Sequence, residues 1–442
     1  MSRVIITVGP DHDDELCFTL SRAPVPPSDR RPRRLDCTVA QLPTGLPPPP
    51  PAGWVRAYGR RLWTELGRHP EVQRALDNAV NGPAGQLQSV LFDLQDQRAE
   101  LFNWEMLCDE QDRFLALTRS PIGRIADQGL DLAGGVPTFD GELRITAVLS
   151  ALGVPAGQEW SGLIGAVRAA RATGLRIRLR VLIGEGDLLD EVTRLAAQDT
   201  DLTAEAVPDR AVDLNRAIAE SRPHILHFFC HGSAEQGQPR LHVATPQDFE
   251  RLALGPSGSV PATPSVRLHL DGMRDLLAPL GVWLVVLNCC QGGMAAQEMH
   301  SLAHSLAAAG VPAALGMRET VQALAAYEFS RVFHRELLDR LGRLLAPDGD
   351  DATDRVIDWT HVLGAPRAAL VESHSDDAGT FGEWTLPVLY TRFDPFTVRI
   401  TAEPPDTPEV QVTRAILEGL LHRLPPDTPA AAIAELRRLA GS

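Results

Sequence analysis

The sequence predicts an α/β fold in three layers, with a mostly parallel β-sheet between two layers of helices. From residue 144 onward, short β-rich runs alternate with helical patterns of ten or more residues, which is typical of βαβ units. Several of these runs are almost wholly apolar, as expected for strands that are covered on both faces. A chain of 442 residues is also long enough for two or three domains and a sizeable core.

The first part of the chain, residues 1–135, is expected to be an N-terminal, β-rich subdomain of strands and helices. A run of five prolines, Pro47–Pro51, interrupts regular structure there and is typical of a polyproline linker or a long surface loop. The expected elements are strands over 4–8, 16–20, 35–39 and 89–94, a helical pattern over 54–81, and an apolar element over 99–107.

Residues 136–395 are expected to form the main α/β domain, and 396–442 a short helical tail. A Pro/Gly/Ser-rich loop is expected over 246–265, and loops of this length are usually functional or disordered. The expected strands are 144–149, 175–183, 224–230 and 283–287; the expected helices are 159–172, 188–198, 214–221 and, in the tail, 409–423 and 430–439.

Composition excludes several chemistries. All 42 cationic residues are Arg, because the chain contains no Lys; lysine-dependent P-loop, kinase and Schiff-base mechanisms are therefore excluded. A net charge of −15 argues against nucleic-acid binding. No stretch is long and apolar enough for a membrane span. The six cysteines are not spaced as a disulfide framework, so we expect a cytoplasmic protein with reduced thiols.

Two apolar runs lead directly into residues that carry chemistry. His231 and Gly232 follow one run, and Cys289 and Cys290 follow another. In an open parallel sheet, ligands bind at the carboxyl ends of strands, where a Cys nucleophile and a His base can meet. The backbone N–H groups of Gly232 and Cys290 are natural oxyanion donors. Strand alternation places Cys290 on the face opposite Cys289 and favours Cys290 as the nucleophile.

Other patterns are weaker, and we expect neither a metal nor a cofactor. The spacing of His224, His227 and His231 resembles a metal-ligand set, but strand alternation puts His224 opposite the other two and no carboxylate follows nearby. We therefore interpret His224 and His227 as core residues. The incomplete glycine fingerprint at 182–189, the His pair at 300 and 304, and the Gly-Ser segment at 255–259 likewise lack the residues that their motifs require.

The His231-Gly232 and Asn288-Cys289-Cys290 segments resemble the CHAT domain of bacterial caspase-like proteases, which are grouped with caspases, metacaspases and separase. The resemblance covers residues from about 54 to 391 in the order expected of that family. Further matching segments lie at 102–107, where Asn103 replaces a Pro, and at 305–317, 325–330 and 384–390.

This resemblance implies a caspase-like three-layer α/β/α sandwich and a cysteine endopeptidase, with Cys290 as nucleophile, His231 as base and no cofactor. It also makes Asn288 the S1 candidate. Related metacaspases carry Asp at that position and prefer basic P1 residues, whereas a neutral Asn offers no ion pair to Arg or Lys. Other walls of the S1 pocket, such as the loop 150–159, remain open as a source of a carboxylate.

The resemblance further implies a protein substrate, such as a gasdermin-like or other effector encoded nearby, an activator protein, and a role in bacterial anti-phage defence or regulated cell death. The loop 246–265 is a candidate gate or self-processing site. The alternative is a catalytically inactive CHAT-like scaffold that binds a partner protein.

Overall fold

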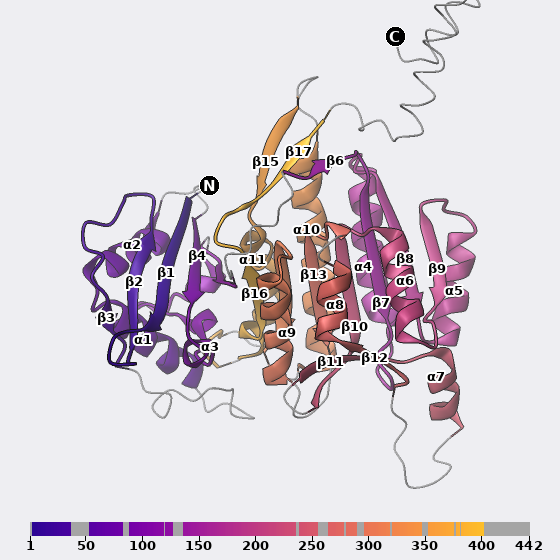
Figure 1. Ribbon diagram of the computed structural model, residues 1–442, viewed down its shortest axis with the longest axis horizontal. Coiled ribbons are helices and arrows are strands. Elements are labelled where there is room, and N and C mark those ends of the chain that lie inside the picture. The colour runs from indigo at the N-terminus through magenta and orange to yellow at the C-terminus, as the bar shows by residue number, and fades with distance from the viewer. Residues whose placement is uncertain are drawn as a thin grey trace, which may run out of the picture.

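The computed structural model confirms the predicted fold class: a large, mostly parallel sheet lies between two layers of helices (Figure 1). The structure describes residues 2–36, 53–82, 88–118, 120–126, 136–235, 238–254, 264–277, 280–289, 296–318, 321–346, 352–374, 377–380 and 382–401. Among the helices in these ranges, none is long and apolar enough to cross a membrane.

The main sheet has the strand order β3-β2-β1-β4-β5-β16-β14-β13-β10-β7-β8-β9, with β11 and β12 extending from β10. Its strands are β1 (Ser2–Pro10), β2 (Leu16–Arg22), β3 (Arg33–Arg34), β4 (Gln88–Leu94), β5 (Ile122–Ile125), β7 (Leu143–Leu149), β8 (Ile177–Ile183), β9 (Leu202–Ala206), β10 (Ile225–Glu235), β11 (Gln238–Val243), β12 (Val266–His269), β13 (Leu284–Cys289), β14 (Ala313–Met317) and β16 (Pro387–Thr391). A three-stranded sheet of β15 (Thr353–Ile357), β17 (Phe396–Ile400) and β6 (Thr138–Phe139) lies at the edge opposite β11 and β12 (Figure 1).

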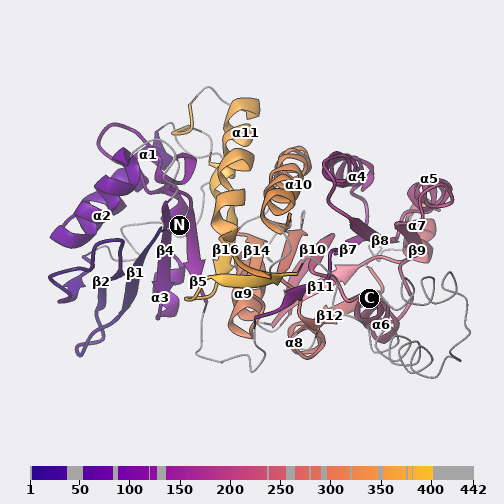
Figure 2. The ribbon, with the colours of Figure 1, turned by 90° about the horizontal axis from the view of Figure 1, so that it is seen from above.

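Helices cover both faces of the sheet, seen from above in Figure 2. One layer contains α1 (Trp54–Leu66), α2 (Pro70–Asn81), α4 (Gly157–Ala172), α5 (Gly186–Ala196), α10 (Ala323–Leu345) and α11 (Gly364–His374); the other contains α6 (Ala211–Ser221), α8 (Leu270–Leu277) and α9 (Ala296–Ala308). Short helices are α3 (Gln97–Glu100), α7 (Pro246–Ala253), η1 (Trp104–Met106), η2 (Leu115–Leu117), η4 (Trp359–Val362) and η5 (Glu383–Thr385). The described residues form two large apolar clusters, one on each face, and a third small cluster of Ile5, Leu91 and Ile125.

Some N-terminal expectations need correction. The single helical pattern over 54–81 is two helices, because Pro70 cannot extend α1 and instead starts α2 at its first position, with His69 as the N-cap. The expected strand at 35–39 is not found in its described part; the two-residue strand β3 precedes it. The proline run Pro47–Pro51 lies outside the described residues.

The loop expected over 246–265 begins with a helix, α7, which Thr245 and Asp248 close with a reciprocal capping box. Much of the remainder of that loop lies outside the described residues, as do both helical patterns of the tail. The expected division of the chain at 135/136 and 395/396 stays a prediction. Across the first boundary β5 pairs with β16, and just past the second β17 pairs with β15.

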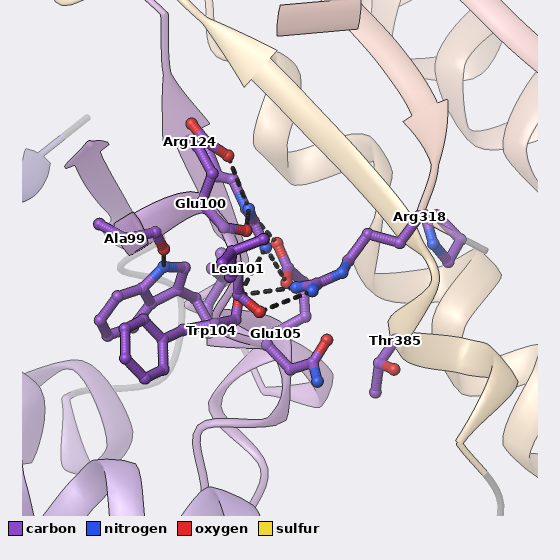
Figure 3. A network of polar contacts seen from close by, with 12 residues as sticks. Ala99, Glu100, Leu101, Trp104, Glu105, Arg124, Arg318 and Thr385 are labelled. Atoms are coloured by element: carbon purple, nitrogen blue, oxygen red, sulfur yellow. Dashed lines mark hydrogen bonds and ion pairs between the residues drawn. The ribbon is translucent and has the colours of Figure 1, made fainter. Parts of the chain in front are cut away.

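A buried charge network joins the N-terminal elements to the sheet (Figure 3). Arg124 of β5 is fully buried and donates two hydrogen bonds to Glu105, from Nε to Oε1 at 3.0 Å and from an Nη to Oε2 at 2.8 Å. It also contacts Glu100 at 2.9 Å. Arg318, just after β14, donates to the carbonyl oxygens of Leu101 and Phe102. Glu105 thus explains the sequence segment 102–107: its carboxylate is a buried counterion.

Replacing Glu105 with Gln should destabilise the fold by about 3–5 kcal/mol, because it leaves the Arg124 guanidinium buried without its paired charge. The matched control is Asp354→Asn, which breaks the exposed Arg399–Asp354 pair and should leave the unfolding free energy almost unchanged, because solvent screens that pair. Urea unfolding of both variants measures the difference, and equal losses would contradict this role of Glu105.

His224 gives the fold a pH dependence. Its ring stacks on Trp283 with centroids 4.2 Å apart, and burial, aided by the neighbouring Arg144, lowers its pKa to about 3. In the unfolded chain the pKa of a histidine is about 6.5. Below that pH the unfolded chain binds a proton that the folded protein excludes, so His224 lowers stability as pH falls.

Between pH 7 and pH 5 this single group should cost about 2 kcal/mol of unfolding free energy. A His224→Phe variant keeps an aromatic ring against Trp283 and should lose that part of the pH dependence. Unfolding free energies of both proteins at the two pH values check this, and an unchanged slope in the variant would contradict it.

Candidate active site

The parallel pairing of β10 with β13 organises the carboxyl edge of the sheet. The ladder runs from Ile225↔Leu284 to Cys230↔Cys289. Beyond it, β10 does not end at Cys230, as the sequence suggested, but continues as a hairpin with β11, where His231 faces His242 and Gly232 faces Leu241. His231 and Gly232 therefore lie where β10 leaves the parallel ladder, and the His231 side chain is half-buried there.

A backbone carbonyl orients the His231 ring. Its Nε2 lies 2.7 Å from the carbonyl oxygen of Leu152. A carbonyl only accepts hydrogen bonds, so Nε2 carries a proton and, in the neutral ring, Nδ1 is the basic nitrogen. Leu152 could not be predicted from the sequence, because its contact uses the backbone and not the side chain.

The loop that carries Leu152 is held on both sides. Ser150 Oγ donates to the carbonyl of Ala244 at 2.5 Å, and the Tyr327 hydroxyl donates to the carbonyl of Pro155 at 2.6 Å. Between them Gly153 adopts φ +79°, a left-handed conformation that favours glycine. The Leu152 carbonyl is thus presented to His231 by an anchored turn.

Asn288, the S1 candidate, lies near the end of β13 and is 1% exposed. Its Nδ2 donates to both carboxylate oxygens of Glu159 at 3.2 Å. The sequence left open a carboxylate from the loop 150–159 as a further wall of the S1 pocket. Glu159, at the end of that range and in α4, contacts Asn288, but its side chain is buried. Asn288 Oδ1 has no hydrogen-bond partner among the described residues.

Cys290 lies outside the described residues, so its contacts with His231, Gly232 and Asn288 stay a prediction. Three other cysteines, Cys17, Cys108 and Cys230, are buried and are not in disulfides. Burial raises the pKa of Cys17 to about 11 and that of Cys108 to about 12. Those two thiols are protonated at neutral pH and therefore unreactive.

A second group of polar side chains was missed by the sequence analysis. Glu159, His227 and His334 come from α4, β10 and α10, and each offers a ligand atom within 4.8 Å of the others. All three are buried. Burial, aided by His227, lowers the pKa of His334 well below its usual value. The sequence analysis sought a carboxylate close to His227 in the chain, whereas this one arrives through the packing of α4 on the sheet.

Comparison with known protein families shows to which family the chain is related. Residues 56–347 match the family model of the CHAT domain, which is well over half of the chain. The chain belongs to the CHAT family. The match confirms the resemblance seen in the sequence and contains His231, Asn288 and Cys290. No curated protein matches the chain.

Solved structures similar to this CHAT protein include the Arg-specific cysteine proteinase gingipain R, with 9% identity and a TM-score of 0.40 over 73% of this chain and 67% of that chain. A complex of pro- and mature domains from Porphyromonas gingivalis has 9% identity and a TM-score of 0.37, covering 72% and 68% of the two chains. The separase–securin complex of Saccharomyces cerevisiae has 11% identity and a TM-score of 0.33, covering 77% of this chain and 17% of that one.

The role of the Gly153 turn in orienting His231 can be tested by substitution, with a second glycine of positive φ as the control. A Gly153→Ala substitution should strain the turn by about 1–2 kcal/mol and displace the Leu152 carbonyl from His231. Gly174→Ala is the control: Gly174 has φ +98° and follows α4, so it should cost similar stability.

The measurement is the rate at which an excess of a thiol-reactive peptide probe labels Cys290, followed by mass spectrometry. We expect Gly153→Ala to slow labelling several-fold while Gly174→Ala leaves it unchanged. Equal rates in the two variants would show that the turn does not orient His231.

Proposed function

We propose that this CHAT protein is a cysteine endopeptidase that cleaves a specific partner protein, with Cys290 as nucleophile and His231 as general base and acid. The observation that carries the proposal is the hydrogen bond between His231 Nε2 and the Leu152 carbonyl. It orients the ring with Nε2 as the donor, and Nδ1 is the nitrogen that we propose takes the thiol proton, as in other cysteine–histidine pairs.

The pairing register supports placing Cys290 beside His231. Cys230 pairs with Cys289 in the last parallel pair, and His231 and Cys290 are the next residues in the sequence. Side chains alternate along strands, and Phe229 and Val286 both pack in the core beneath α4 and α10. By alternation from these residues, His231 and Cys290 belong to that same face.

In the proposed reaction, Cys290 Sγ gives its proton to His231 Nδ1 and attacks the carbonyl carbon of the scissile peptide bond. The backbone N–H groups of Gly232 and Cys290 are the proposed donors to the oxyanion that forms. His231 then returns the proton to the leaving amine as the C–N bond breaks. Water, deprotonated by His231, hydrolyses the thioester and releases the second product.

Asn288 remains the proposed S1 residue because it lies two positions before Cys290. Its amide nitrogen is committed to Glu159, so Oδ1 is the atom that it offers to a P1 side chain. A single neutral acceptor provides no ion pair. We therefore expect no strong selectivity for Arg or Lys at P1.

The biological part of the proposal rests on the family. We propose a cytoplasmic enzyme that acts in bacterial anti-phage defence or regulated cell death, cutting an effector such as a gasdermin-like protein encoded nearby once an activator protein is present. The loop 246–265 is the proposed gate or self-processing site. The alternative is an inactive scaffold of the same fold that binds its partner without cutting it.

Co-expression with proteins encoded nearby tests the function. We expect one partner to be cleaved by the wild type and by Cys289→Ser, and to stay intact with Cys290→Ser or His231→Ala. Cys289→Ser is the matched control because it alters the neighbouring thiol. Sequencing the new terminus then gives the P1 residue.

Two outcomes would contradict the proposal. Cleavage that persists in Cys290→Ser would assign the nucleophile to another residue. Stable co-purification of an uncleaved partner with both the wild type and Cys290→Ser, together with no cleavage of any partner encoded nearby, would support the scaffold.

A further inference from the structure

Glu159, His227 and His334 form a compact group of metal-ligating side chains between the sheet and the helices α4 and α10. The two imidazoles and the carboxylate each place one ligand atom within 4.8 Å of the others. Their exposed fractions are 1%, 0% and 2%. Polar groups buried this deeply require partners, because an unsatisfied one loses its hydrogen bonds to water without replacement.

Hydrogen bonds among the described residues do not satisfy these imidazoles. His227 Nε2 lies 2.8 Å from Glu159 Oε1, yet the direction of the ring N–H does not meet the oxygen, and neither nitrogen of His227 has a hydrogen-bond partner among the described residues. His334 Nε2 also has none. These unpaired nitrogens lie beside a buried carboxylate, so the group has unused ligand atoms facing one small volume.

The contacts around Glu159 prepare it as a ligand. Asn288 donates to both of its oxygens and Ser330 donates to Oε1, so the carboxylate is oriented by neutral donors. Outer hydrogen bonds of this kind fix ligating carboxylates in metal sites. The two rings meet edge to face, with centroids 4.8 Å apart.

We propose that Glu159, His227 and His334 bind a divalent cation, with Zn²⁺ the favoured ion. Two imidazoles and one carboxylate are a donor set that Zn²⁺ accepts, with water in a fourth position, whereas Ca²⁺ and Mg²⁺ prefer oxygen ligands. The ion would neutralise the buried carboxylate charge and join β10 to α4 and α10. Through Asn288, it would also fix the end of β13.

The site is distinct from the proposed catalytic pair. His227 precedes His231 by four residues on β10, and the zinc would stabilise the strand that presents the base and take no part in peptide cleavage. Metal content can therefore be measured without any assay of peptidase activity.

The test is elemental analysis of the full-length protein, purified without chelators and without a metal-affinity step. We expect about one zinc per chain in the wild type, and a loss of at least several-fold in Glu159→Gln and in His334→Ala. His304→Gln is the matched control: His304 lies on α9 against Tyr390, outside the group, and its variant should keep the wild-type content.

Removing a ligand can itself prevent folding, so the wild type provides a second measurement. Metal-stripped wild type should take up one Co²⁺ per chain, with the visible absorption of a four-coordinate site, and Zn²⁺ should raise its Tm. A folded wild type that contains no zinc and takes up neither ion in excess would overturn the proposal, leaving a hydrogen-bonded cluster. Variants that retain full metal content would overturn it also, since the ion would lie elsewhere.

Discussion

Parallel pairing of β10 with β13 is the constraint on which the site depends. This pairing brings His231 and Asn288 to the same edge of the sheet. The register Cys230↔Cys289 decides which residues are neighbours there. A slip of one residue would reverse the faces of every side chain on one strand. The apolar side chains beneath α4 and α10 and those beneath α8 and α9 oppose such a slip, because each face of both strands is buried. The geometry of the site is therefore a consequence of core packing.

Arginine side chains link several of the buried polar groups in this core. A chain without lysine uses the planar guanidinium, whose several donors can join two elements at once. Arg124 binds the carboxylates of Glu100 and Glu105, and Arg367 donates to the carbonyls of Ile122 and Pro387, on different strands. The absence of lysine first served only to exclude mechanisms. In the structure, buried arginine side chains connect the N-terminal elements to the central strands of the sheet.

The sequence predicted what depends on local pattern. Apolar runs located β7, β8 and β13 closely, together with the start of β10. Strand ends led to the prediction of His231 and Cys290, and the family resemblance led to that of Asn288. It did not reveal features that depend on packing or on backbone atoms. The Leu152 carbonyl has no side-chain signal, and Glu159 reaches His227 and Asn288 only because α4 packs on the sheet. The hairpin of β10 with β11 was missed for a similar reason, since the pairing of an edge ribbon is decided by its partner strand.

The claim that His231 activates Cys290 is tested most directly by the pH dependence of Cys290 alkylation, followed at that residue by mass spectrometry. The account predicts that the wild-type thiol reacts as a thiolate well below pH 8 and that His231→Ala shifts this reactivity toward the range of an ordinary cysteine, near pH 8.5. The same profile in both proteins, matching free cysteine, would contradict it.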